Sequence, residues 1–125
     1  MDSLIAELEA AAEGNRELDY AIAKEMGWQF SGEHTFKEHG FFWRDATTDE
    51  WKQLPRWSTS LDAALTLVPE GFVWRVSTDF GPIAWAAVSG HKGIFWADTK
   101  SEALTAALAL CIAALKARQA MEAAV

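Results

Sequence analysis

The stretch from Pro55 to Val76, PRWSTSLDAALTLVPEGFVWRV, decides the fold because it predicts a helix that is followed at once by a strand. Thr59-Ser60-Leu61-Asp62 approximates a capping box, with Asp where Glu or Gln is usual. Apolar residues then recur at helical spacing: Leu61, Ala64, Leu65 and Val68. Pro69 ends the helix, and Gly71 frees the backbone to turn into the strand. This stretch is a scaffold feature and contains no catalytic signature.

Two short helices are predicted before this stretch, from Ser3 to Glu13 and from Arg16 to Met26, because each carries an apolar stripe. Gly14 and Asn15 interrupt the pattern between them. Gly27 stands where a left-handed C-terminal cap is expected. The N-terminal region therefore predicts a bent helical hairpin or one kinked helix.

Three strands are predicted after the central helix, from Phe72 to Thr78, Ile83 to Ser89 and Ile94 to Ala97. The turns between them are short, so the strands should be antiparallel neighbours in a meander. Both faces of the middle strand are apolar, which predicts a central strand that is covered on both sides. Alternation favours core positions for Trp74 and Trp85.

The last helix is predicted to begin at the capping box Thr99-Lys100-Ser101-Glu102 and to run to about Met121. Its core stripe is Leu104, Leu108, Cys111, Ile112 and Leu115. Because Cys111 lies in this stripe, a buried small hydrophobe is favoured over a nucleophile. Together these segments predict a single domain over residues 1–125 with an α+β fold. It would be a layered α/β sandwich, in which an antiparallel sheet of at least three strands is packed by N-terminal, central and C-terminal helices.

Three segments taken together carry a resemblance that covers nearly the whole chain. They are Arg16-Glu17-Leu18-Asp19 with Gly27-Trp28, the stretch from Pro55 to Leu65, and the stretch from Ala103 to Arg118. In this order they resemble the phage ABA sandwich domain, a family of small bacteriophage and prophage proteins. The resemblance implies a layered sandwich expressed in the bacterial host, and it brings no catalytic residues. The segment from Phe30 to Leu54 departs most from the family pattern, so any specialised role is expected there.

Composition and charge restrict the function. Eleven basic and eighteen acidic residues give a net charge of −7, which opposes direct nucleic-acid binding and suits a basic protein partner or plain solubility. The acidic N-terminus lacks the basic start and apolar core of a signal peptide. The longest uncharged run, from Ala103 to Leu115, is shorter than the ~20 residues that span a bilayer. With a single cysteine, these features predict a protein of the host bacterial cytoplasm with no membrane partner.

The residues that suggest catalytic or metal chemistry have simpler interpretations. His34 and His39 lie near Glu33 and Glu38, but their spacing matches no recognised ligand pattern and the flanking glycines favour a loop. Gly90-His91-Lys92-Gly93 joins two predicted strands, which favours a turn over a phosphate loop. No serine stands in a nucleophile-elbow context. The sequence therefore predicts no enzyme activity, no metal and no cofactor.

Tryptophan and arginine are paired three times, as Trp43-Arg44, Arg56-Trp57 and Trp74-Arg75. Both residue types are enriched at binding hot spots, and each pair should divide between the core and the outside. Two of the pairs fall between Trp28 and Trp57, where periodicity fails and only Phe41 to Arg44 predicts a strand. The candidate binding residues are Trp43, Arg44, Asp45, Asp49, Glu50, Trp51, Arg56 and Trp57.

Three functions fit this pattern. The leading hypothesis is a non-enzymatic phage protein that inhibits a host anti-phage defence component by direct binding. In it, Asp45, Asp49 and Glu50 would meet a basic partner, such as a nucleic-acid-binding protein. The alternative is a sponge that sequesters a nucleotide immune signal in an aromatic pocket between protomers of a homo-oligomer, with Arg44, Arg56 or Arg75 on phosphate. The third hypothesis is a structural or assembly protein of the virion.

Overall fold

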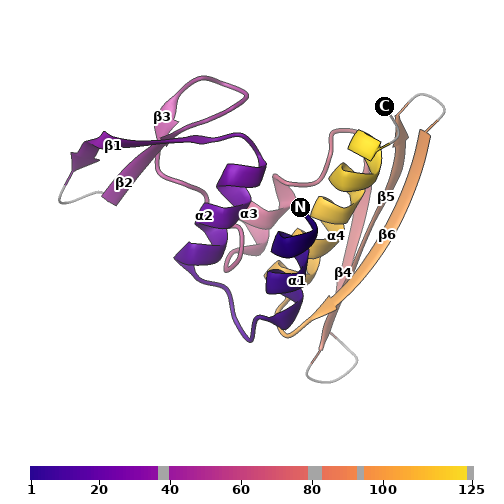
Figure 1. The fold of residues 1–125 in the computed structure, drawn as a ribbon. Coiled ribbons are helices and arrows are strands. Elements are labelled where there is room, and N and C mark those ends of the chain that lie inside the picture. The colour runs from indigo at the N-terminus through magenta and orange to yellow at the C-terminus, as the bar shows by residue number, and fades with distance from the viewer. Residues whose placement is uncertain (37–39, 79–82, 93–94, 124–125) are drawn as a thin grey trace.

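The structure is a computed structural model that describes residues 1–36, 40–78, 83–92 and 95–123. Within these residues the chain forms four helices and two three-stranded antiparallel sheets, which confirms the predicted α+β class (Figure 1). In chain order the elements are α1 (Asp2–Ala10), α2 (Arg16–Glu25), β1 (Gln29–Phe36), β2 (Gly40–Arg44), β3 (Trp51–Lys52), α3 (Leu61–Leu65), β4 (Val73–Ser77), β5 (Ala84–Lys92), β6 (Phe95–Ala103) and α4 (Ala106–Ala123).

The larger sheet is the predicted meander, with β5 in the centre and β4 and β6 on either side. Helix α4 lies along one face of this sheet, and in the described part of the chain no helix covers the other face (Figure 1). The prediction that β5 is covered on both sides is therefore wrong. Ala86 and Val88 are buried beneath α4, whereas Trp85 is only half-buried on the outer face.

Trp74 and Trp85 were predicted to be core residues, and neither is fully buried. Trp74 is 44% exposed because β4 is an edge strand, so a large ring there extends past the cover that α4 provides. The Arg75 guanidinium lies 5.8 Å from the ring centroid of Trp85 on the outer face. Trp74 and Arg75 are both exposed, so this pair does not divide between core and surface.

Strand β6 continues through the predicted capping box, and α4 begins only at Ala106. Pairing with β5 extends as far as Ala103, and the Thr99 hydroxyl lies 2.7 Å from the Ala113 carbonyl and 3.2 Å from the Val88 carbonyl instead of capping a helix. The residue that accepts at the true N-terminus is Thr105, whose Oγ1 receives the Leu108 N–H at 3.2 Å. Residues 99–102 match the capping-box pattern, but their pairing with β5 keeps them in a strand. The same pairing places the predicted turn residues Gly90, His91 and Lys92 inside β5.

Helix α2 begins and ends at residues that form local caps. The side chain of Asn15 caps α2 by accepting the N–H of Leu18 at 2.9 Å. Gly27 has φ of 84°, and the Trp28 N–H donates to the Ala23 carbonyl, which closes the predicted left-handed cap. Of the two predicted forms, the structure therefore has the helical hairpin of α1 and α2 and not one kinked helix.

The central helix is shorter than predicted. It occupies Leu61–Leu65 and is capped by Ser60, whose Oγ accepts the N–H of Ala63 at 3.3 Å. Leu61 is exposed, and the buried apolar side chains of this region are Ala64 and Leu67. A single helical turn presents only a narrow stripe to α4, so Leu61 lies beyond the contact.

Residues 28–57, predicted to be largely irregular, contain the second sheet, in the order β1-β2-β3. The predicted strand from Phe41 to Arg44 is confirmed within β2. The register of the second sheet places Gln29, Arg44 and Trp51 side by side on one face. Phe30, Trp43 and Lys52 lie side by side on the other face. Trp43 is 4% exposed and stacks on Tyr20 of α2, with ring centroids 5.8 Å apart. The Trp43 ring therefore joins this sheet to α2, and the Gln29 face is on the opposite side of the sheet.

Candidate functional site

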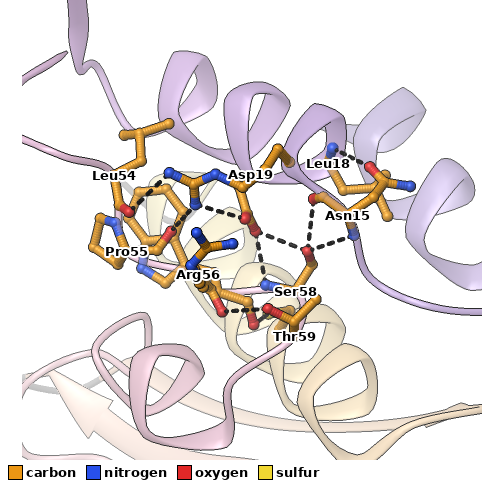
Figure 2. A network of polar contacts seen from close by, with 11 residues as sticks. Asn15, Leu18, Asp19, Leu54, Pro55, Arg56, Ser58 and Thr59 are labelled. Carbon is orange, nitrogen blue, oxygen red and sulfur yellow. Dashed lines mark hydrogen bonds and ion pairs between the residues drawn. The ribbon is translucent and has the colours of Figure 1, made fainter. Parts of the chain in front are cut away.

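A buried polar network joins the start of α2 to the segment 54–58, which we call the arch (Figure 2). Asp19 Oδ1 accepts the backbone N–H of Ser58 at 2.8 Å and lies 2.8 Å from the Ser58 hydroxyl. The same hydroxyl accepts the Asn15 N–H at 3.0 Å and lies 2.9 Å from the Asn15 carbonyl. Asp19 and Ser58 are both fully buried. Every group in this network has a partner, as buried polar groups require.

Arg16 ties the same helix to the other end of the arch. Its Nη1 is 3.0 Å from Asp19 Oδ2, and the guanidinium also donates to the carbonyls of Leu54 and Pro55 (Figure 2). The planar fork of arginine suits this triple contact, because one group satisfies a carboxylate and two carbonyls together. The arch is thereby held at both ends by α2.

The network is structural rather than catalytic. The Ser58 hydroxyl is sealed from solvent, so a substrate cannot reach it. A Cβ on Gly14 would lie 1.9 Å from the Ser58 carbonyl oxygen, so glycine is required for this close approach. Cys111 donates its thiol to the Trp57 carbonyl, and burial, with a smaller effect of the Asp19 charge, raises the pKa of that thiol. The predicted burial of Cys111 is confirmed.

The turn between β2 and β3 is held by its own side chains. Asp45 Oδ1 accepts both the N–H and the hydroxyl of Thr47 at 2.8 Å, and Oδ2 lies 2.9 Å from Lys52 Nζ. Burial alone would raise the pKa of Asp45, but the hydrogen bonds from Lys52 and Thr47 outweigh it and hold this pKa well below its ordinary value. Asp49 has φ of 65°, a left-handed conformation that aspartate tolerates in turns. The turn is therefore a rigid, charged projection.

The outer face of the β-hairpin, which consists of β2, β3 and the turn between them, gathers four of the eight predicted binding residues. We define the hairpin patch as Arg44, Asp49, Glu50 and Trp51 together with Gln29. Arg44 Nη2 lies 2.6 Å from Asp49 Oδ1, and the hydrogen bond and charge of Arg44 lower the pKa of Asp49. Trp51 is 44% exposed beside this ion pair. Another predicted residue, Asp45, is buried under the turn and shapes it without presenting its carboxylate.

The remaining predicted residues lie elsewhere. Trp43 and Trp57 are buried, so they support the hairpin and the arch and cannot form part of a contact surface. Arg56 is exposed on the arch. The division of each Trp-Arg pair between inside and outside is therefore confirmed for Trp43-Arg44 and Arg56-Trp57. The three arginines considered for a nucleotide pocket lie on separate parts of the fold: Arg44 on the β-hairpin, Arg56 on the arch and Arg75 on the larger sheet.

A second feature, which sequence reasoning missed, is a hollow of about 220 Å³ between the hairpin, the arch and α4. We call it the tryptophan hollow. Its lining residues are Met26, Trp28, Asp45, Ala46, Thr47, Lys52, Pro55, Trp57, Thr66, Leu67 and Arg118. They come from five separate segments of the chain, so no local motif could reveal them.

The tryptophan hollow has indole rings and cations in its wall. The rings of Trp28 and Trp57 meet edge to face with centroids 5.4 Å apart, and Trp57 Nε1 donates to Thr66 Oγ1 at 3.1 Å. Lys52 Nζ lies 5.6 Å from the Trp28 ring, and Arg118 donates through Nε to the Leu67 carbonyl. Burial lowers the pKa of Arg118, against the opposing charge of Glu122.

The predicted absence of a metal site concerns a region that the structure only partly describes. Glu38 and His39 lie outside the described residues, and the side chains of Glu33 and His34 are not described either. Among the residues that are described, no three His, Cys, Asp or Glu side chains group to hold a metal ion. None of the described helices has the length and apolar character needed to cross a bilayer.

Comparison with known proteins leaves the function to be argued from the structure itself. No protein-family model, curated protein or solved structure matches this chain.

Proposed function

We propose that this chain is a non-enzymatic binding protein that contacts a partner protein through the hairpin patch. The observation that carries the proposal is Trp51, a large ring that is 44% exposed on a rigid turn beside Arg44 and Glu50. Trp and Arg are the residues on which binding energy concentrates at protein interfaces. A turn already fixed by Asp45 and Thr47 loses little conformational entropy when a partner binds.

The charge of the patch defines the partner. Within the hairpin patch, Arg44 neutralises Asp49. Glu50 therefore gives the patch its net negative charge. The whole chain carries a net charge of −7, which accelerates encounter with a basic surface and repels nucleic acid. In keeping with the resemblance to the phage ABA sandwich domain, we propose that the chain is phage-encoded. It would act in the host cytoplasm by binding and inhibiting a basic component of an anti-phage defence system.

The test is affinity capture from the bacterial host with four forms of the protein: wild type, Trp51→Ala, Glu50→Lys and Glu7→Lys. Glu7 is an exposed acid of α1, away from the hairpin, and controls for net charge alone (Figure 1). We expect wild type and Glu7→Lys to retain one host protein at near-equal amounts, and Trp51→Ala to retain at least about tenfold less, as hot-spot truncation does. Equal retention by all four forms, or no retained protein at all, contradicts the proposal.

A further inference from the structure

The tryptophan hollow is independent of the hairpin patch, and its wall has the chemistry of a binding site for an anion. Arg118 is half-buried, and its Nε alone is hydrogen-bonded, to Leu67, within the described part of the chain. Its two terminal amino groups have no partner there. A guanidinium that is partly removed from water and has donors to spare is stabilised most by a carboxylate or a phosphate.

The local charge favours an anion although the chain as a whole is acidic. Two cations line the hollow, Lys52 and Arg118, against the single carboxylate of Asp45. Lys52 neutralises Asp45 at 2.9 Å, which leaves the charge of Arg118 unbalanced in the wall. Glu122, the acid that acts on Arg118, is exposed and does not line the hollow.

The apolar part of the wall and the volume set the size of the ligand. Trp28 is half-buried and supplies indole surface, on which flat rings stack favourably, and the buried Trp57 ring holds it from behind through their edge-to-face contact. A volume of about 220 Å³ exceeds the roughly 150 Å³ of a cavity that holds benzene, and falls below the ~300 Å³ at which drug-sized sites begin. The hollow therefore accommodates one ring and one small charged group.

We propose that the tryptophan hollow binds a small anion that carries one flat ring, an aromatic carboxylate or a phosphate monoester. Arg118 holds the charged group, and the ring lies against Trp28. This site differs from the predicted nucleotide pocket, because none of the arginines considered there lines it.

The probes are phenyl phosphate and benzoate, which distinguish the two anions, with benzyl alcohol as the neutral control and inorganic phosphate as the control without a ring. In ¹⁵N-labelled wild-type protein, we expect phenyl phosphate or benzoate to shift the indole N–H signals of Trp28 and Trp57 saturably, and to leave that of Trp85 in place. Benzyl alcohol and inorganic phosphate should bind at least about tenfold more weakly, because benzyl alcohol lacks the negative charge and inorganic phosphate lacks the ring. Equal binding of benzyl alcohol, or no saturable shift with either anion, overturns the proposal.

Variants test the role of Arg118 directly. Arg118→Gln should weaken binding of the preferred anion by about tenfold or more, since a charge-assisted hydrogen bond is lost. Lys116→Gln is the matched control, because it removes a cation from the same helix outside this hollow. Unchanged affinity in a folded Arg118→Gln protein overturns the assignment, and the wild-type spectra above decide it if that variant does not fold. Glu50→Lys should still bind the anion, so failure of the hairpin proposal is distinguishable from failure of this one.

Discussion

Replacing Asp19 with alanine tests the claim that the arch is held by the buried network. The change removes the acceptor of the Ser58 backbone N–H and the ionic partner of Arg16, while the Ser58 hydroxyl keeps the Asn15 carbonyl. An orphaned buried donor costs about 1–3 kcal/mol. Breaking a buried ion pair costs about 3–5 kcal/mol. Because the Arg16 side chain is 32% exposed, solvent screens its ion pair with Asp19. We therefore expect the free energy of unfolding to fall by about 3 kcal/mol, the low end of the ion-pair range.

The assay is urea unfolding followed by tryptophan fluorescence, with thermal unfolding as a second measure. For a domain of this size, a loss of about 3 kcal/mol lowers Tm by about 12 °C. Asp19→Asn keeps an acceptor for Ser58 but turns an amide toward Arg16, so its loss should be smaller. The control is Glu17→Ala, which alters an exposed acid on the same helix and should change stability by less than about 0.5 kcal/mol. A loss below about 1 kcal/mol for Asp19→Ala would refute the structural role of the network.

Two further predictions concern titratable groups. The folded pKa of Asp45 lies below its ordinary value of 3.8, so its stabilising contribution is complete above about pH 5 and is lost as the pH falls toward the folded pKa. Asp45→Asn should therefore lose less stability than wild type between pH 5 and pH 2 in urea titrations, and parallel curves would contradict the Lys52 and Thr47 contacts. Cys111 is buried with a raised pKa, so the native protein should react with a thiol reagent only as fast as it unfolds. A fast reaction in wild type would place the thiol at the surface.

Much of the α+β architecture was predictable because it depends on neighbours within a few residues. The left-handed Gly27, the cap at Ser60 and the meander of β4, β5 and β6 all follow from short-range hydrogen bonds and period-two alternation. The candidate site was partly predictable for the same reason. The strand at Phe41 to Arg44 was recognised, and the cross-strand pairing of Arg44 with Trp51 then completed the hairpin patch.

The sequence by itself determined the fold class, the net negative charge and the buried position of Cys111, since composition and local periodicity suffice for these. The tertiary structure alone decided where β6 gives way to α4, because pairing with β5 outweighs a local capping box. It also decided the second sheet, the exposure of Trp74, the arch and the tryptophan hollow. Asp19 and Ser58 are 39 residues apart in the sequence, and Arg118 and Leu67 are 51 residues apart. No local sequence pattern therefore predicts these contacts. Only the packing of distant segments brings such groups together.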